Sequence, residues 1–219
     1  MNKRFVLVFF LFLCLIFLAK PSSANSALTW NSTFGAYMIT NCTQLQNMSL
    51  NLSGSYRLAN DINCSNTTSW NSGSGFAPIG SEGSSFSGNL NGAGFTISNL
   101  YISRTSTTYV SLIGHASGAT ITNLNVANVN ISGSSCVGGI VGFANPITIT
   151  NCSSSGTVRS ISSSVYDAST GGILGGAFNS FVANSYSSVN VFGSYPDIGG
   201  LIGMLWGGAV NSSDRKSVV

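Results

Sequence analysis

The sequence predicts an all-β protein that coils as a β-solenoid, and its composition, internal repeats and shortage of helix formers each support this class. Only 6% of the 219 residues are charged, 43% are hydrophobic and 26 are glycine. A coiled coil would be rich in alanine, glutamate, lysine and leucine, and a disordered chain would carry more charge. Glycine, serine, asparagine and β-branched residues instead suit short strands joined by tight turns.

Four related segments set the architecture of the second half of the chain. They read SLIGHASG, GIVGFANP, GILGGAFN and GLIGMLWG, and their shared glycine falls at Gly114, Gly142, Gly175 and Gly203. The intervals between these glycines are 28, 33 and 28 residues, and each repeat holds an apolar run followed by a second β-type segment. Such a period predicts one winding of a solenoid per repeat, with equivalent residues stacked about 4.8 Å apart in neighbouring rungs.

An asparagine follows each repeat glycine at a nearly fixed distance, at Asn123, Asn151, Asn184 and Asn211. Asparagine tolerates the left-handed backbone that turns need, and its amide can bond to the asparagine above and below it. We therefore expect a structural asparagine ladder at one corner of the coil. A row of ligands for a bound molecule is the functional alternative.

Residues 28–108 are less regular than the later repeats, and we assign residues 25–75 to an N-terminal cap that includes the first strands. A solenoid needs a cap because its end rung exposes unpaired strand edges. Trp30 and Trp70 are expected to pack in this cap, and residues 76–213 form the predicted repeat region.

Residues 1–24 have the pattern of a secretory signal peptide. A basic start, MNKR, precedes an unbroken apolar run from Phe5 to Ala19, and small residues before Asn25 suit cleavage after Ala24. The run is short for a membrane span, although an uncleaved anchor is the alternative. The leader predicts a secreted or cell-surface protein.

Four cysteines remain after the leader, and an even number in an exported chain favours disulfides. Pairing Cys42 with Cys64 and Cys136 with Cys152 closes the shortest loops, so we expect these two bridges; the first would tie the cap together. Buried free thiols are the alternative. The sequence has no C-x-x-C pair, which argues against zinc.

Ordered motifs over about residues 40–213 resemble the GLUG-repeat proteins, which are secreted or surface-attached, adhesin-like proteins of bacteria and archaea. The motifs are LQNMSLNLSGSYRLANDINC, FAPIG, FSGNLNGAGFTISNLYI and the repeated GGIVG, GGILG and GGLIG. The resemblance implies a right-handed parallel β-helix in an exported, often very long protein, which in some members carries a separate enzyme domain such as an IgA-cleaving metallopeptidase. It supplies no catalytic residue. The segment SLIG departs from the pattern because Ser111 replaces a glycine.

The last six residues, 214–219, read DRKSVV, are abruptly charged and fit no repeat position in the sequence. The same string results from translating a common sequencing adapter. We interpret this tail as an artefact, which predicts that the chain is a truncated fragment of a longer protein. A genuine polar tail that caps the solenoid is the alternative.

The charge of the chain restricts its partners. The formal net charge is +3, but Lys3, Arg4 and Lys20 lie in or beside the leader, and five acidic residues balance the five basic ones that remain. Without a basic stripe the chain lacks the footprint of a nucleic-acid binder. We expect cell-surface glycans or proteins as partners, and membrane contact only through the signal peptide or a missing anchor.

Candidate catalytic residues are sparse. His115 is the only histidine, and it follows the repeat glycine at a position that varies among repeats, so a scaffold position is a better interpretation than a triad member. Asp167 and Asp197 lie about one repeat apart and could meet on adjacent coils as a carboxylate pair, although solvated loop acids are the simpler interpretation. No calcium-binding repeat is present, and we expect no metal and no cofactor.

Exposed aromatic residues could stack on sugars if they stood in a row, although aromatic residues in strands are more often part of the packing. The candidates are Tyr101, Tyr109, Tyr166, Tyr186, Tyr195 and Trp206.

These observations predict a non-enzymatic secreted or cell-surface β-helix scaffold, adhesin-like, that displays loops or carries a missing downstream domain. Two alternatives stay open. A polysaccharide-active enzyme of the pectin-lyase-like type would gather charged residues in one groove, whereas this chain's candidates could lie on different faces: Asp61, Asp167, Asp197, Arg104 and Arg159. The other alternative is the repeat region of a larger secreted peptidase.

Overall fold

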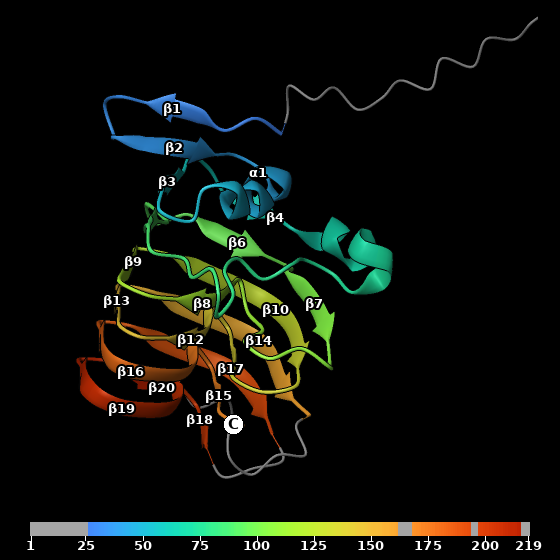
Figure 1. Cartoon of the computed structure of the whole chain (residues 1–219), viewed down its shortest axis with the longest axis vertical. Coiled ribbons are helices and arrows are strands. Elements are labelled where there is room, and N and C mark those ends of the chain that lie inside the picture. Colours follow the sequence, from blue (N-terminus) through green and yellow to red (C-terminus); the bar gives the residue numbers. More distant parts are fainter. Residues whose placement is uncertain (1–25, 162–167, 194–196, 216–219) are drawn as a thin grey trace, which may run out of the picture.

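In the computed structural model the chain winds into a parallel β-solenoid of about four turns (Figure 1). The structure describes residues 26–161, 168–193 and 197–215, and of residue 215 it describes only the backbone. The predicted all-β class and stacked coil are confirmed. The predicted leader, residues 1–24, lies outside the described residues and stays a prediction.

Three sheets run along the coil over the described residues, and successive windings each add strands to them. The first has ten strands: β1 (Thr29–Asn31), β2 (Ala36–Ile39), β3 (Ser55–Leu58), β5 (Asn89–Asn91), β8 (Ile113–Ala116), β9 (Ala119–Thr122), β12 (Val141–Ala144), β13 (Ile147–Thr150), β16 (Leu174–Ala183) and β19 (Ile202–Asn211). The second has seven: β4 (Ile62–Asn63), β6 (Thr96–Ser98), β7 (Tyr101–Arg104), β10 (Asn125–Gly133), β14 (Ser153–Ser160), β17 (Tyr186–Phe192) and β20 (Asp214–Arg215). The third has three: β11 (Val137–Gly138), β15 (Thr170–Gly171) and β18 (Ile198–Gly199). The strands of each sheet pair in parallel, apart from β1 with β2.

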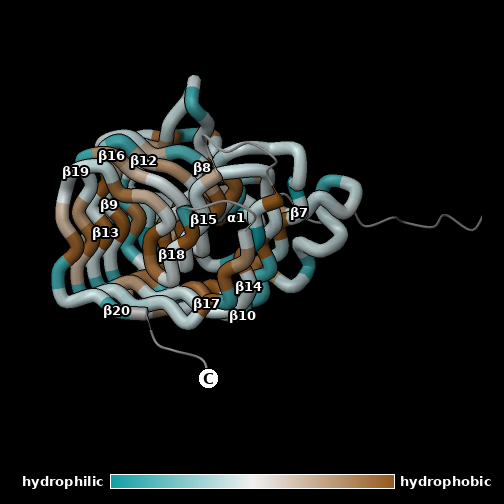
Figure 2. The backbone as a smooth tube through the Cα atoms, turned by 90° about the horizontal axis from the view of Figure 1, so that it is seen from below, coloured by the Kyte–Doolittle hydropathy of each residue, from teal (hydrophilic) through white to brown (hydrophobic). Residues whose placement is uncertain are grey.

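Apolar side chains stack inside the coil from one winding to the next. Leu90, Ile121, Ile149 and Val182 pair in register on successive strands of the first sheet, and each is at most 1% exposed. Burying one such side chain stabilises the fold by about 1.5–3 kcal/mol. Figure 2 looks along the coil and shows the hydrophobic stretches of β9 and β13 following one another. The alternation of apolar and polar residues in these strands therefore fixes which face points inward.

The repeat glycines lie directly above one another, as the sequence predicts: Gly114, Gly142, Gly175 and Gly203. A Cβ on Gly142 would lie 2.7 Å from the carbonyl oxygen of Gly114, and a Cβ on Gly175 would lie 2.5 Å from that of Gly142. Side chains do not approach backbone this closely without a shift of the chain. The column therefore requires glycine because there is no space for a larger residue.

The predicted asparagine ladder is present at the corner after the first sheet. Asn123, Asn151 and Asn184 have left-handed backbone, with φ of 52°, 54° and 50°. The Nδ2 of Asn151 donates to Oδ1 of Asn123 at 3.1 Å, and the Nδ2 of Asn123 donates to Oδ1 of Asn91 at 3.4 Å. Since the amides of Asn91, Asn123 and Asn151 bond to one another, the ladder has a structural role, and it begins one rung earlier than predicted.

The prediction for Asn211 is wrong by one position. Asn211 pairs with Ala183 inside β19, and Ser212 takes the left-handed turn with φ of 46°. The apolar residues that point into the coil set the strand register, and Val210 pairs with Val182 there. The asparagine in the last repeat comes one residue too early to reach the corner.

A second asparagine ladder was missed by the sequence analysis. The Nδ2 of Asn99 donates to Oδ1 of Asn63 at 3.0 Å, and the Nδ2 of Asn128 donates to Oδ1 of Asn99 at 2.6 Å. Asn99 and Asn128 also have left-handed backbone, with φ of 59° and 53°. The ladder lies along the second sheet and begins in the less regular part of the chain, so no single period reveals it.

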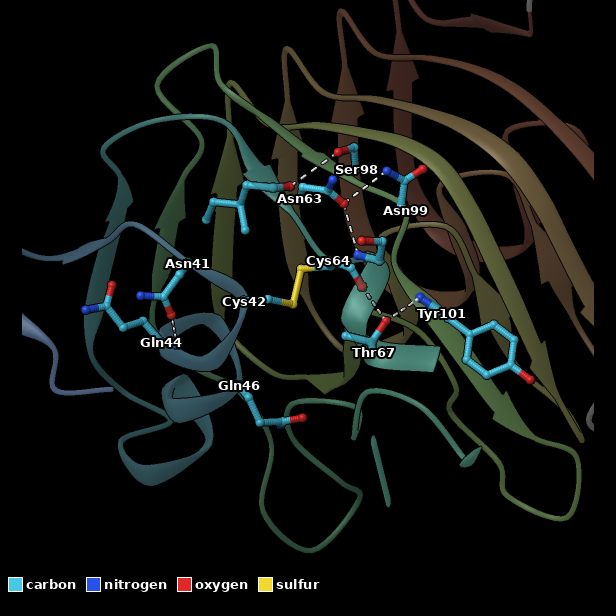
Figure 3. The surroundings of a disulfide bond; sticks show 12 residues. Asn41, Cys42, Gln44, Gln46, Asn63, Cys64, Thr67, Ser98, Asn99 and Tyr101 are labelled. Atoms are coloured by element: carbon cyan, nitrogen blue, oxygen red, sulfur yellow. Dashed lines mark hydrogen bonds between the residues drawn. A yellow bond between two sulfur atoms is a disulfide. The ribbon is translucent and has the colours of Figure 1, made fainter. Parts of the chain in front are cut away.

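Helical turns close the N-terminal end: α1 (Cys42–Gln46), η2 (Asn47–Leu50) and η3 (Ser65–Gly73), where η denotes a 3₁₀ helix. The side chain of Asn41 caps α1 by accepting a hydrogen bond from the N–H of Gln44 at 2.9 Å. η3 docks on β7, where the Oγ1 of Thr67 accepts a hydrogen bond from the N–H of Tyr101 at 3.0 Å (Figure 3).

Both tryptophans expected in the cap pack against other rings. Trp30 packs edge-on against Tyr37, with ring centroids 5.1 Å apart. Trp70 stacks on Phe76 at 6.3 Å.

One predicted disulfide is confirmed and the other is wrong. Cys42 and Cys64 are bonded, with a Cα–Cα distance of 5.4 Å, and they join α1 to the first strand of the second sheet (Figure 3). Cys136 and Cys152 are buried and are not bonded to each other in a disulfide. Cys136 precedes β11 and Cys152 follows β13, so the two occupy different parts of one winding although they are close in the sequence. The thiol of Cys152 donates to the carbonyl oxygen of Thr150 at 3.3 Å.

Two residues of the charged tail do occupy a repeat position, which the sequence analysis did not expect. Asp214 and Arg215 form β20 and pair with Tyr186 and Ser187 of β17. The backbone ladder places no demand on charge, so a charged pair can follow the turn at Ser212. The origin of residues 214–219 stays a prediction.

Gly175→Ala is expected to lower the free energy of unfolding by about 1–3 kcal/mol, as overpacking of a tight site does. The new Cβ would lie 2.5 Å from the oxygen of Gly142 and 2.7 Å from the nitrogen of Val137. Gly83→Ala is the matched control, because a Cβ there meets nothing within 4 Å. Urea unfolding measures both variants, and equal midpoints would contradict the glycine column.

Peptide mapping without reduction is expected to recover Cys42 linked to Cys64, with Cys136 and Cys152 as thiols outside any disulfide. Burial raises the pKa of the Cys152 thiol to about 11, and the residue is 1% exposed. Alkylation of Cys152 at about pH 8 should therefore require denaturant, because the thiolate is the reactive form. A peptide that links Cys136 to Cys152 would contradict the structure.

Candidate functional site: an aromatic groove across the windings

A groove with a volume of about 830 Å³ crosses the windings where β8, β12, β16 and β19 stack in register. These four strands and the segments next to them supply its lining: Glu82, Ser85, Thr108, Tyr109, His115, Ser117, Ser135, Cys136, Phe143, Asn145, Ser169, Phe178, Asp197, Met204 and Trp206. Because the windings are stacked, residues from four repeats come together on one surface.

Rings from consecutive windings form a line along this groove, which we call the aromatic row: Tyr109, His115, Phe143, Phe178 and Trp206. The ring centroid of Phe143 lies 5.4 Å from that of His115 and 5.6 Å from that of Phe178, and Phe178 lies 6.1 Å from Trp206. Rungs repeat about every 4.8 Å, so one ring per winding produces spacings of this size.

The rings of the aromatic row differ in how much of each is exposed to solvent. Trp206 is 72% exposed, Phe143 and Phe178 are half-buried, and His115 is 9% exposed. Tyr109 packs beside the buried end, with its ring 5.2 Å from His115 and 5.5 Å from Phe143. The row therefore offers ring faces and edges to a ligand at one end and a closed wall at the other.

His115 lies at the buried end of the aromatic row. Its Nδ1 is 2.8 Å from the Oγ of Ser85. Burial lowers the pKa of His115 below its ordinary value, and the carboxylate of Glu82 acts in the opposite direction. His115 pairs with Phe143 in register, which confirms the alignment expected from the repeats. His115, Phe143 and Met204, which occupy this position in three of the repeats, line the groove, so the variation among repeats changes the chemistry of this surface.

Hydroxyl and amide groups surround the aromatic row. Ser135 and Ser169 are 3% and 2% exposed in the wall, and the Oγ of Ser169 donates to the Sγ of Cys136 at 3.4 Å. Thr108 and Asn145 lie at the exposed rim. Such groups can donate and accept hydrogen bonds to a polar ligand.

The groove has carboxylates but no lysine or arginine among its described lining residues. Glu82 belongs to the winding before that of β8. Asp197 lies beside β18, in a winding three rungs beyond β8. Each rung adds about 4.8 Å, so the two are much farther apart than the roughly 5–10 Å between the carboxylates of glycosidases. The described residues also hold no cluster of three or more histidine, cysteine or acidic residues that could bind a metal.

Most other charged candidates are elsewhere. The Oδ1 of Asp61 accepts from the N–H of Thr96 at 2.8 Å, the Nε of Arg104 donates to the oxygen of Phe76 at 3.2 Å, and the guanidinium of Arg159 lies 4.7 Å from the ring centre of Phe192. Of the five charged candidates only Asp197 lines the groove, and Asp167 is outside the described residues.

Of the six aromatic candidates, the structure brings Tyr109 and Trp206 together in the groove. Tyr101 and Tyr186 belong to β7 and β17 of the second sheet, and Tyr166 and Tyr195 are outside the described residues. Phe143 and Phe178 were missed. Their distances from the repeat glycines would have revealed them, since Phe143 follows its glycine by one residue, as His115 does, and Phe178 follows its glycine by three, as Trp206 does.

The described part of the chain contains no helix that is long and apolar enough to cross a membrane.

Comparison with known proteins agrees with the stacked coil. The family described as "The GLUG motif" matches residues 133–159, which is one winding from the end of β10 through β14. Halomucin of Haloquadratum walsbyi is 36% identical over 158 residues, which cover 66% of this chain and 2% of halomucin. The immunoglobulin A1 protease of Streptococcus sanguinis is 30% identical over 187 residues, which cover 82% of this chain and 9% of the protease.

A crystal structure from Bacteroides ovatus, described as that of an immunoglobulin A1 protease, has the same fold. Its TM-score is 0.56 at 20% identity, and the match covers 78% of this chain and 62% of that one. The fold is thus a β-solenoid, and the two sequence relatives make it a region homologous to parts of large surface or secreted proteins. The chain is a GLUG-motif protein related to halomucin and to IgA1 protease-like surface proteins. It spans only a small part of the length of those two relatives.

The ring of His115 is expected to titrate below about 6.5 in the folded chain, and NMR of the single histidine measures it directly. Between the folded and unfolded pKa values the unfolded chain binds more protons. The contribution to stability is therefore complete above about pH 6.5 and is lost as the pH falls from there toward the folded pKa.

Glu82→Gln should lower the pKa of His115 further, because the Glu82 carboxylate raises it. Asp214→Asn is the control, since Asp214 lies in β20 of the second sheet and outside the groove lining. An unchanged pKa of His115 in Glu82→Gln would show that the carboxylate does not act on the ring.

Proposed function

We propose that the chain is a non-enzymatic, adhesin-like scaffold of a secreted or cell-surface protein. The observation that carries the proposal is the continuous in-register stack of the first sheet, in which strands from β2 to β19 follow one another along the coil. Such a stack makes a rigid rod, because each winding is hydrogen-bonded to the next. The rod holds its outer side chains and loops at fixed positions for contact with a partner.

The groove chemistry supports a scaffold over a pectin-lyase-like enzyme. Catalysis on a glycosidic bond needs two acidic or otherwise reactive groups on either side of that bond. Here Glu82 and Asp197 lie at opposite ends of the groove, and the arginines Arg104 and Arg159 contact other parts of the coil. The Ser85–His115 contact has no third group that is hydrogen-bonded to the imidazole among the described residues.

A second candidate function is the repeat region of a larger secreted peptidase. The 30% identity to the streptococcal immunoglobulin A1 protease over 82% of this chain favours it. In that protein the chain would position a catalytic domain encoded elsewhere in the gene. Sequencing the locus in its source decides this: a peptidase motif in the same reading frame supports the second candidate, and its absence removes it.

The full chain, produced in a host that exports it, is expected to leave the cytoplasm and to begin at Asn25 by N-terminal sequencing. The purified product should release no new reducing ends from neutral or acidic polysaccharides and no fragments from immunoglobulin A1. Retention of the chain in the cytoplasm would contradict the surface assignment. Sustained turnover that His115→Gln abolishes would contradict the non-enzymatic assignment.

A further inference from the structure

The aromatic row runs along the coil axis, across the strands. Its members come from successive windings, and neighbouring rings are 5.4, 5.6 and 6.1 Å apart from His115 to Trp206. A ligand that contacts several rings must therefore extend across several windings. This geometry suits a chain of repeating units better than a single small molecule.

The backbone around the groove is not available to a ligand. β12 pairs with β8 on one side and with β16 on the other, and β16 pairs with β19. A peptide that binds by adding a strand needs a free sheet edge, and the floor of the groove offers none between β8 and β19. Recognition must come from ring faces, hydroxyls, amides and carboxylates of side chains.

The charge of the groove excludes one class of chain. Glu82 and Asp197 are exposed carboxylates, and the described lining contains no lysine or arginine to compensate them. An acidic polymer would be repelled, because like charges at short range disfavour binding. The carboxylates leave neutral and basic chains as candidates, and the aromatic rings with the exposed hydroxyl and amide of Thr108 and Asn145 favour a neutral chain that carries hydroxyl groups.

We propose that the aromatic row binds a neutral glycan chain along the coil axis, with the apolar C–H groups of successive sugars against the faces and edges of Phe143, Phe178 and Trp206, whose planes are tilted by 74° and 52° from one ring to the next. The hydroxyl groups at the edges of the sugars then meet the polar rim at Thr108 and Asn145. This inference rests on the proposed scaffold function and names the chemical class of its partner.

Binding of soluble, uncharged oligosaccharides to the purified full chain tests the proposal. Calorimetry with cellohexaose, xylohexaose, mannohexaose and N-acetylchitohexaose is expected to find at least one ligand, bound at least tenfold more tightly than its disaccharide. Trp206→Ala should weaken that ligand at least fivefold, because it removes an exposed ring of the row. Trp30→Ala is the matched control and should change the affinity less than twofold, since Trp30 is 56% exposed but lies in β1 at the other end of the coil.

Four results would overturn the inference: no binding by any of the four hexasaccharides, equal affinity for hexasaccharide and disaccharide, equal effects of the two tryptophan variants, or preference for oligogalacturonate or oligolysine. Circular dichroism of each variant separates loss of binding from loss of folding. Different results would contradict the proposed scaffold function and the glycan assignment. Bound oligosaccharide that is shortened with time contradicts the non-enzymatic scaffold, whereas absent binding by an exported and inactive chain contradicts only the glycan assignment.

Discussion

The parallel backbone ladder between windings is the constraint on which the rest of the molecule depends. Each strand of the first sheet fixes the position of the next, so a residue at one place in a winding meets its equivalent in the winding above. The glycine column marks where this constraint is tightest, since the carbonyl oxygen of one glycine occupies the space that a side chain on the next would need. Apolar stacking stabilises the coil, and the ladder decides which side chains take part.

How much the sequence could predict follows from this constraint. Only glycine fits at a position where any Cβ would clash, so glycine recurs there in every winding. The sequence alone therefore shows the spacing of these glycines. Asn211 shows the limit, because the turn is set by register and Ser212 can adopt it. The prediction of a Cys136–Cys152 disulfide was wrong for a related reason. Cys136 and Cys152 are separated by less than one winding, so they are close in the sequence but lie beside different sheets of the coil.

The aromatic row was hidden because its members do not share one distance from the repeat glycine. His115 and Phe143 follow the glycine by one residue, whereas Phe178 and Trp206 follow it by three. The rings still meet, since a ring is long enough to reach from a neighbouring position into the same line. A surface row thus tolerates changes of position that the glycine column does not.

The interior changes along the coil in a way that composition alone does not predict. Ile97 and Val126 pair at an inward position of the second sheet, and Ser154 and Ser187 follow at the same position in later windings. Both serines are at most 2% exposed, and the Oγ of Ser154 donates to the oxygen of Gly172 at 2.6 Å. A Cβ on Gly172 would lie 2.0 Å from the Oγ of Ser187. Small residues on both sides let the third sheet approach the second, and the hydrogen bond compensates the buried hydroxyl.

The same ladder limits how long a ligand the groove can accommodate. Rungs repeat about every 4.8 Å, while the rings are 5.4–6.1 Å apart because they lean from different positions in their windings. A rigid polymer matches such a row only over a few units before its own repeat drifts away from the rings. Contacts therefore add up over the windings between His115 and Trp206 and gain little beyond them. For a longer rod of the same kind, tighter attachment would come from further grooves along the rod, each of which binds weakly on its own.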